Sequence, residues 1–409
     1  MFVFYCRMAE TNHCNFFLEK KNRFCRMLTK DGSDYCGEHQ TFAPTELQEV
    51  ADQFARMVCP LDSSHTCYVR HLKKHLRKCN ANKKDPVYIT HGLNRGSSTN
   101  DEIHGSTLCT IDDLALVQLI SKIETVCTGI IPSVTERSSV HPRLQKEIET
   151  QANGVNSKRQ LSQVSSLLSL IEKFNSIHAD TCFLEFGAGR GMLTYWLGEI
   201  TAEVPQSSFL LIERSAYRHK FDGRLSTKRD CVVRRVKADI GDLNLDEIEL
   251  LKEHQHLVAL SKHLCGAATD MALRCMTMTC EDISMKFRSI FIATCCHHRC
   301  DISSYVAMDY LVELGFEISD FNVMCGITSW ATCGSRKNEL IRKPENSVDR
   351  YARLQLTHEK RRKIGRMCKL IFDYGRIKFL EKYGYNGVLT YYVPESVSPE
   401  NVCLIAIKN

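Results

Sequence analysis

Short apolar runs alternate with turns and helical segments through the second half of the chain. Five runs have the length and composition of buried strands, at residues 182–186, 208–213, 231–240, 256–266 and 289–296. Apolar residues recur with helical spacing in residues 111–126, 161–174 and 268–278, and residues 386–408 are typical of two further strands about a turn. Because strands and helices alternate, we predict an α/β fold with a mostly parallel sheet and an added antiparallel pair.

The same pattern divides the chain into four segments. Residues 1–45 and 55–82 are rich in Cys and His and poor in apolar residues, residues 83–109 are polar and turn-rich, and residues 110–409 carry the strand and helix pattern. We therefore predict two small modules, a linker, and a large domain that begins with a helical lead-in.

Composition narrows where such a protein works. Apolar residues make up 43% of the chain and charged residues 25%, as in ordinary globular proteins, and no apolar run has the roughly eighteen residues that would suggest a membrane span. The first residues do not resemble a signal peptide, so we expect an intracellular protein, nuclear or cytoplasmic. Thiols stay reduced there, and the 21 cysteines consequently indicate metal sites or catalysis rather than disulfides.

The first module carries four metal-ligand residues in a segment that cannot bury a core of its own. They are spaced C-x10-C-x10-C-x2-H, at Cys14, Cys25, Cys36 and His39. Three thiolates and one imidazole complete the tetrahedral shell of zinc, which predicts a structural ion. Cys6 and His13 are alternative ligands.

The second module has the spacing C-x5-H-x9-H-x3-C, at Cys59, His65, His75 and Cys79. His75 and Cys79 lie four residues apart, so a helix would present both on one face to the same ion. Cys67 and His71 compete as ligands. We predict a second structural zinc ion here.

Positive charge is concentrated in two regions, although the net charge is only +6. Residues 56–84 contain eight Lys/Arg against one acid, and residues 342–382 contain thirteen against five. Beside a zinc module, the stripe of Arg70, Lys73, Lys74, Arg77 and Lys78 favours contact with nucleic acid over a merely solvated surface. The basic helical pattern of residues 353–384 predicts further phosphate contacts, with a solvated helix or a nuclear import signal as alternatives.

A glycine-rich turn follows the first buried run of the large domain. Gly187, Gly189 and Gly191 would let the backbone approach a ligand at the amino end of a helix. Glu213 ends the next run, 22 residues past Gly191, where doubly wound folds place the acid that binds ribose hydroxyls. The pattern therefore predicts a site for a nucleotide-type cofactor.

The G-x-G-x-G spacing, with Glu185 two residues ahead of it, resembles the first motif of class I S-adenosylmethionine-dependent methyltransferases. The resemblance implies a Rossmann-like domain in which Glu185 and the three glycines hold the methionine part of the cofactor. It further implies that Glu213 binds the ribose and that Asp239, or Asp242, lies near the adenine.

The ends of the fourth and fifth runs should face the same ligand, because open α/β sheets bind ligands outside the carboxyl ends of their strands. These ends read KHLCG at residues 262–266 and TCCHHRC at residues 294–300. We interpret both as part of an active site. A zinc ion bound by Cys295 with His298, or by Cys296 with Cys300, is an alternative for the second.

The order of these motifs along essentially the whole chain resembles the TRM13 family of eukaryotic tRNA 2′-O-methyltransferases. The resemblance implies methyl transfer from S-adenosylmethionine to the ribose 2′-hydroxyl of nucleotide 4 in the tRNA acceptor stem, with the zinc modules helping to hold the acceptor end. We expect two zinc ions, one per module, and infer no obligate protein partner. A 2′-hydroxyl must lose its proton, so Lys262 and His263 are the first catalytic candidates, followed by His297 and His298.

Two other functions remain open at this point. An RNA cytosine-5 methyltransferase would use Cys265 and Cys295 or Cys296 as attacking and releasing thiols, although the chain lacks the Asp-x-Pro-Cys pattern of such enzymes. A zinc-finger RNA-binding protein with an inert methyltransferase fold is the other alternative, which the intact glycine motif and the three acids disfavour.

Overall fold

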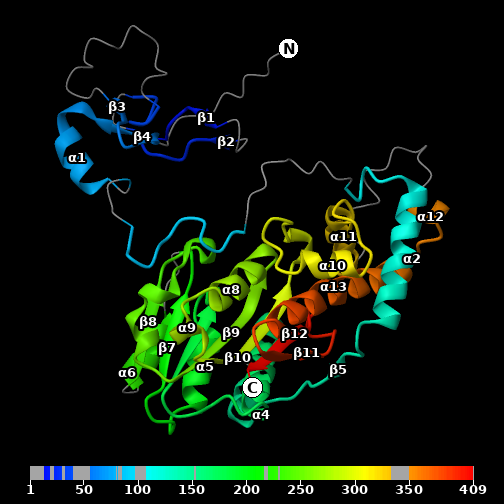
Figure 1. Ribbon diagram of the computed structural model, residues 1–409. Coiled ribbons are helices and arrows are strands. Elements are labelled where there is room, and N and C mark those ends of the chain that lie inside the picture. The colour runs from blue at the N-terminus through cyan, green and yellow to red at the C-terminus, as the bar shows by residue number, and fades with distance from the viewer. Residues whose placement is uncertain are drawn as a thin grey trace. The chain divides into compact units, whose positions relative to one another are not determined.

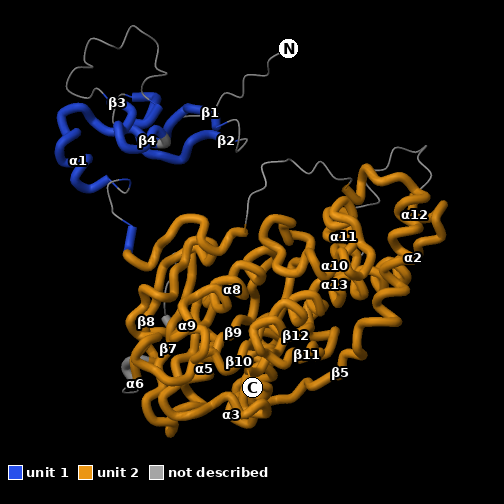
Figure 2. Tube along the Cα trace, in the orientation of Figure 1, with its two compact units in different colours: residues 1–86 blue, residues 87–409 orange. Residues whose placement is uncertain are grey.

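The computed structural model describes residues 13–18, 23–29, 33–39, 56–79, 81, 85–96, 107–151, 153–215, 220–228, 231–332 and 350–408. The chain forms two compact units, residues 1–86 and residues 87–409 (Figure 2). None of the helices in the described ranges is both long and apolar enough to cross a membrane.

The first unit consists of two hairpins and one short helix. Strands β1 (Phe17–Leu18) and β2 (Arg23–Phe24) pair antiparallel, as do β3 (Arg56–Cys59) and β4 (Asp62–Tyr68), and α1 (Leu72–Lys78) follows. Among the described residues of this unit, the apolar side chains that are fully buried are all cysteines, namely Cys14, Cys25, Cys36, Cys59, Cys67 and Cys79. The unit therefore has no aliphatic core in its described part.

The second unit is built on one eight-stranded sheet with the order β5-β11-β12-β10-β9-β6-β7-β8. Strands β6 to β10 run parallel, whereas β12 is antiparallel to both β10 and β11 (Figure 1). The bounds are β5 (Thr135–Glu136), β6 (Thr181–Phe186), β7 (Ser208–Ile212), β8 (Val232–Val236), β9 (His256–Cys265), β10 (Phe287–Cys295), β11 (Tyr385–Tyr391) and β12 (Val402–Lys408). The predicted α/β fold with an antiparallel pair is confirmed.

Helices cover both faces of this sheet (Figure 1). Successive strand residues point to opposite faces, so Leu184 of β6 enters the core shared with α2, α8, α11 and α13, while Phe183 enters the core shared with α4 and α5. The bounds are α2 (Asp113–Gly129), α3 (Pro142–Glu149), α4 (Val155–Lys173), α5 (Met192–Ile200), α6 (Lys220–Lys228), α7 (Glu249–Lys252), α8 (Ala267–Thr277), α9 (Glu281–Ser284), α10 (Met308–Glu313), α11 (Asp320–Thr328), α12 (Arg350–Arg353) and α13 (His358–Glu381).

Residues 87–96, predicted as part of a linker, instead lie against the second unit. Asn94 is buried, and its side-chain amide donates to the carbonyl oxygens of Ile240 and Leu243 at 2.7 Å each. Ile89 forms a β-bridge with Leu243. The linker prediction is therefore wrong for this segment, because one buried Asn and a run of backbone hydrogen bonds hold a polar stretch that has no apolar periodicity to reveal it.

Helix α13, predicted as a basic surface for RNA, is mostly a core helix. Its described apolar residues pack under the sheet, and Arg376 is almost fully buried in ion pairs with Asp270 and Asp373. Lys360, Arg362 and Lys363 of its first turns remain exposed. Arg353 and Lys382, at the two ends of the predicted segment, are exposed as well. The phosphate-contact prediction is consequently limited to the ends of the segment, because charge counted along the sequence does not separate buried from exposed cations.

Candidate active site and metal sites

The glycine turn connects β6 to α5 and takes the backbone conformation that glycine permits. Gly187, Gly189 and Gly191 have φ angles of 66°, 52° and 82°. A side chain at Gly191 would approach Asp222 within 2.7 Å, whereas one at Gly189 would meet nothing within 4 Å. The turn thus packs tightly at Gly191. At Gly189 the space beside Cα is open, while its carbonyl oxygen accepts from Arg235 at 3.0 Å.

Glu185 is the penultimate residue of β6, just ahead of this turn, and is 3% exposed. Its Oε2 accepts from the backbone N–H of Thr194, at 3.1 Å, and from the Thr194 hydroxyl. Burial raises the pKa of Glu185 to about 7, although the two hydrogen bonds from Thr194 oppose the shift. Glu185 therefore holds the first turn of α5 in place beneath the glycine turn.

The other two predicted acids lie at the ends of β7 and β8. Glu213 accepts from the N–H of Gly189 at 2.9 Å, so it reaches the open side of the glycine turn. Asp239 accepts from the N–H of Gly241 and pairs with Arg214 and, at 3.4 Å, with Arg95. Asp242, the alternative to Asp239, is occupied by the N–H of Gly92 and by Arg95, which belong to the packed segment 87–96. The structure therefore brings Glu213, but not Asp242, to the glycine turn.

Lys262 and His263 form a β-bulge at the carboxyl end of β9. The pairing with β10 passes from Ser261–Ile292 to Leu264–Thr294, so β9 contains one extra residue at this point. Bulges redirect side chains, and here Lys262 is half-buried while His263 is exposed. The bulge adjoins the glycine turn, since a side chain at Gly187 would lie 3.7 Å from the carbonyl oxygen of His263.

The bulge gives its two side chains different acid–base properties. Burial lowers the pKa of Lys262 to about 8, against the charges of Glu185 and Cys295, and its ammonium donates to Gln160. Partial burial and the charge of Lys262 lower the pKa of His263 to about 4. Near neutral pH, Lys262 is therefore close to its titration range, whereas His263 is neutral.

Three thiols gather where β9 and β10 end. Cys265 and Cys295 are direct neighbours across the strands, with their sulfur atoms 3.3 Å apart, and the sulfur of Cys296 lies within 4.8 Å of both. Hydrogen bonding from Cys295 lowers the pKa of Cys265 to about 6, and the same bond raises the pKa of Cys295. His298 and Cys300, considered as metal ligands with Cys295 and Cys296, do not join these three thiols in a group that could hold one ion.

His297 is buried behind this cluster and takes part in a polar network. Its Nε2 donates to Asp373 Oδ1 at 2.8 Å, and Asp373 also accepts from Arg376 and Thr294, both at 2.8 Å. Arg376 pairs in turn with Asp270. Only 2% of His297 is exposed, so of the candidate bases it is the one best placed to brace the loop.

Glu400 is a site residue that sequence reasoning missed. It lies between β11 and β12, its Oε1 accepts from the N–H of Cys296 at 3.1 Å, and its Oε2 pairs with Lys369. His298 is exposed on the same side, and partial burial lowers its pKa. The PEN sequence of residues 399–401 resembles any turn between strands, so no local signal marked Glu400.

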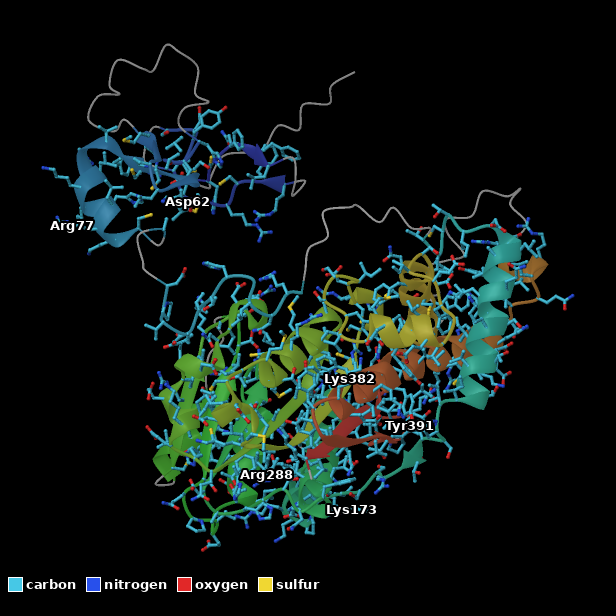
Figure 3. The ribbon with its side chains drawn as sticks, viewed as in Figure 1. Asp62, Arg77, Lys173, Arg288, Lys382 and Tyr391 are labelled. Atoms are coloured by element: carbon cyan, nitrogen blue, oxygen red, sulfur yellow. The ribbon has the colours of Figure 1, made fainter. Side chains whose placement is uncertain are left out.

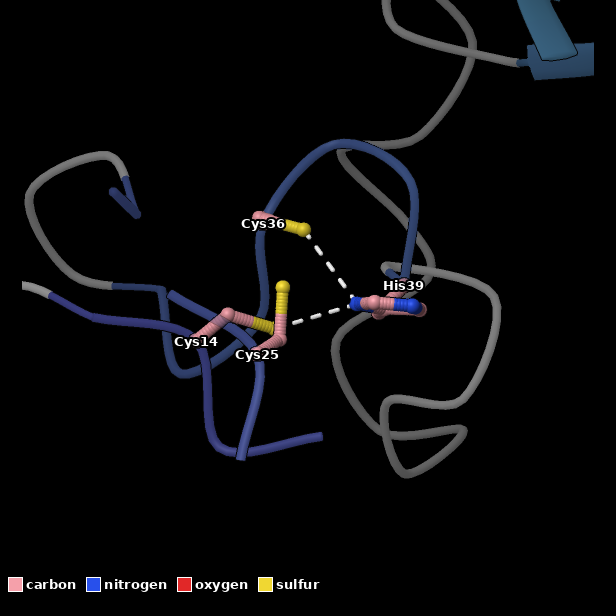
Figure 4. Close-up of side chains that lie close together, drawn as sticks. All are labelled: Cys14, Cys25, Cys36 and His39. Carbon is pink, nitrogen blue, oxygen red and sulfur yellow. Dashed lines mark hydrogen bonds between the residues drawn. The ribbon is translucent and has the colours of Figure 1, made fainter. Parts of the chain in front are cut away.

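The four predicted ligands of the first module converge (Figure 4). Nδ1 of His39 lies 3.4 Å from the sulfur of Cys14 and 3.3 Å from that of Cys36, and all four ligand atoms lie within 4.8 Å of one another. His13 is not part of this group and bridges Leu28 instead. Cys6 lies outside the described residues.

The predicted ligands of the second module converge in the same way. The sulfur atoms of Cys59 and Cys79 are 3.7 Å apart, and the Nε2 atoms of His65 and His75 are 3.2 Å apart. Nδ1 of His65 donates to Asp62 at 3.2 Å, which leaves Nε2 for an ion. The competing residues Cys67 and His71 are not part of this group in the structure.

Comparison with known proteins matches all three parts of the chain. Residues 162–407 match the family described as "Methyltransferase TRM13", residues 12–40 the "CCCH zinc finger in TRM13 protein", and residues 56–80 the "U11-48K-like CHHC zinc finger". The chain belongs to the TRM13 family. The predicted methyltransferase class is thereby confirmed, and zinc and S-adenosylmethionine are the ligands that membership in the TRM13 family implies.

Curated TRM13 relatives are similar over nearly their full length. A Mus musculus protein named "tRNA:m(4)X modification enzyme TRM13 homolog" is 33% identical, with 96% of this chain and 94% of the relative covered. The Homo sapiens protein of the same name is 32% identical, with 97% and 94% covered. In Saccharomyces cerevisiae, the "tRNA:m(4)X modification enzyme TRM13" is 30% identical, with 98% and 97% covered.

The basic stripe of the second TRM13 zinc module is exposed on and beside α1. Arg70, Lys73, Lys74, Arg77 and Lys78 all keep exposed side chains, and Arg77 extends from the helix (Figure 3). Exposed cations beside a zinc module are placed where phosphates can reach them.

Proposed function

We propose that the chain transfers the methyl group of S-adenosylmethionine to the ribose 2′-hydroxyl of nucleotide 4 in the tRNA acceptor stem. One observation carries the proposal: the glycine turn meets the β-bulge with Lys262 and His263 at the ends of β6 and β9. Strand order reverses between these two strands, which is where open α/β sheets bind their ligands. The relatives' name, tRNA:m(4)X modification enzyme, supports tRNA and position 4.

The residues at this point fit S-adenosylmethionine. The space beside Cα of Gly189 is open to close approach, Glu213 accepts from its N–H, and Asp239 follows β8. When bound, the cofactor supplies an electrophilic sulfonium methyl group. We assign Glu185, Gly187, Gly189 and Gly191 to its methionine part, Glu213 to the ribose hydroxyls and Asp239 to the surroundings of the adenine.

Lys262 is our first choice for the group that removes the proton of the 2′-hydroxyl. A general base works best when its pKa lies near the working pH, and the pKa of Lys262 is lowered to about 8. His263, with a pKa of about 4, is a weaker base and is assigned to hydrogen bonding with the substrate. His298 is exposed beside them, and His297 positions the loop through Asp373.

The two modules are assigned one structural zinc ion each and a part in holding tRNA. Each module supplies four ligand atoms and leaves no position open, as expected of structural sites. The exposed stripe on α1 is suited to the phosphates of the acceptor stem, which are recognised by charge and shape rather than by sequence.

Labelled methyl transfer tests this proposal. The full chain is incubated with unmodified tRNA and methyl-labelled S-adenosylmethionine, and the labelled nucleoside and its position are identified by mass spectrometry. We expect a 2′-O-methylnucleoside at position 4, and in Lys262→Met a rate lower by about 100-fold or more with cofactor binding retained. Lys173→Met, an exposed lysine on α4 (Figure 3), is the matched control. Tight tRNA binding without any labelled product would favour the inert RNA-binding protein.

Cytosine-5 methylation is the second candidate, and one observation favours it. The pKa of Cys265 is lowered to about 6, so this thiol is largely a thiolate at neutral pH and would be a competent nucleophile. Label in 5-methylcytosine, abolished by Cys265→Ser but not by Lys262→Met, would replace the 2′-hydroxyl proposal by this one.

A further inference from the structure

The cluster of Cys265, Cys295 and Cys296 is not explained by methyl transfer to a hydroxyl. Its three sulfur atoms lie within 4.8 Å of one another, as the ligand atoms of each zinc module also do. Such a spread is narrow enough for all three to contact one ion, because zinc–sulfur bonds are about 2.3 Å long. In its described part the chain therefore contains three thiol-rich groups, and the family descriptions name only the first two.

The backbone that carries these thiols adopts conformations that are unfavourable for most loop residues. Cys296 has φ of 52° and ψ of 42°, a left-handed conformation that costs a non-glycine residue on the order of 1 kcal/mol. Its N–H donates to Glu400, which fixes this conformation. Gly266 has φ of 56°, and a side chain there would approach the carbonyl oxygen of Arg299 within 2.5 Å. The two strand ends are thus held together by specific contacts.

We propose that Cys265, Cys295 and Cys296 bind a zinc ion with a fourth position left open. Three protein ligands with one open position are typical of catalytic zinc, in contrast to the closed four-ligand sets of the two modules. The thiols would lose their protons to the solvent as the ion binds, and three thiolates on Zn²⁺ leave one negative charge. The charge of Arg299 acts on this cluster and offsets it.

The open position would take the oxygen of a water molecule or of a hydroxyl substrate. A zinc ion lowers the pKa of an oxygen ligand by several units, so it would assist the deprotonation assigned to Lys262. This role rests on the proposed methyl transfer to a 2′-hydroxyl, whereas the existence of the metal site does not. The cluster directly follows the bulge with Lys262 and His263, which places both on the same strand end.

Zinc counting on the full chain tests the site. The protein is purified with zinc and without chelator, and the number of zinc ions per chain is measured by inductively coupled plasma mass spectrometry. We expect three ions in the wild type and two in Cys265→Ser and in Cys296→Ser, whose side chains are half-exposed and tolerate the change better than the buried Cys295. Cys280→Ser, an exposed cysteine outside the three groups, should keep three. Two ions in the wild type would overturn the proposal.

A second measurement needs no variant. Alkylation of each cysteine is followed by peptide mass spectrometry with zinc present and after chelation. We expect Cys265 and Cys296 to be protected together by zinc, while Cys280 reacts equally in both states. A disulfide between Cys265 and Cys295, or zinc-independent alkylation of Cys265 and Cys296, would contradict the site. Three zinc ions without methyl transfer would support the metal site and refute the proposed function. Two zinc ions with methyl transfer would refute the metal site and support the proposed function.

Discussion

The two units of this chain contain comparable sulfur clusters but differ in what holds each fold together. In the described part of residues 1–86, cysteines are the fully buried apolar residues, whereas the sheet of residues 87–409 separates two cores of Leu, Ile, Val and Phe side chains. A unit without an aliphatic core depends on its metal ions for folding. In a unit that has an aliphatic core, thiols are not needed for folding and can take part in catalysis. Similar thiol clusters are therefore expected to respond very differently to metal removal.

Metal removal should have the largest effect of the tests below and should unfold the first unit but not the second. After chelation, we expect the amides of residues 56–79 and of the first module to lose protection from hydrogen exchange entirely, because folding and zinc binding are one equilibrium there. The amides of β6, β9 and β10 should keep their protection, since aliphatic cores on both faces of the sheet hold these strands. Hydrogen exchange read by mass spectrometry on the full chain measures both in one sample. Protected amides in the first unit after verified zinc loss would refute its dependence on the metal.

Arg376→Met tests whether the second unit depends on its buried charges as the first depends on zinc. The substitution leaves Asp270 and Asp373 buried without their cation, and we expect the free energy of unfolding to fall by about 3–5 kcal/mol. Arg362→Met on the same helix is the matched control: it removes an ion pair with Glu395 whose arginine is 47% exposed, against 1% for Arg376. We expect a loss of under about 1 kcal/mol there. Equal losses in denaturant unfolding would contradict this difference.

The same network shows what the sequence could and could not predict. The zinc ligands and the glycine turn are close in sequence, so their spacing alone identified residues that the structure brings together, and the apolar runs predicted the sheet. Asp373 and Glu400 are distant in sequence from His297 and Cys296, and only the packing of α13 and the β11–β12 turn joins them. The bulge at Lys262 was equally invisible, because it depends on the register of two strands.

Glu185→Gln tests whether a residue assigned to cofactor binding in the sheet domain lowers the stability of that domain. Because the pKa of Glu185 is about 7 in the folded protein, above its ordinary 4.5, the folded state binds more protons and stability falls as pH rises between these values. The glutamine does not titrate. We therefore expect the variant to match wild type near pH 4 and to be more stable by about 3 kcal/mol at about pH 8.

Thermal unfolding at fixed zinc concentration measures this difference, with Glu203→Gln, an exposed acid beyond α5, as the control. The variant should also bind S-adenosylmethionine more weakly, because the cofactor's cationic methionine part loses a nearby carboxylate. Stability that declines with pH as steeply as in the wild type would show that another group causes the decline.

Asp62→Asn, in the first unit, should have the smallest effect, a modest loss of zinc affinity. The carboxylate of Asp62 accepts from Nδ1 of His65 at 3.2 Å and so orients Nε2 toward the second zinc site. Such outer partners contribute about 10- to 100-fold to metal affinity, and we expect the lower end because Asp62 is 42% exposed. Competition with a coloured chelator measures the affinity, and Ser63→Ala, which changes the exposed neighbour, should leave it unchanged. Since the described part of this unit has no aliphatic core to compensate, the weaker affinity should appear as an equal loss of folding stability at a fixed free zinc concentration well above Kd. A loss of affinity without that loss of stability would show that contacts other than the ion hold the module together.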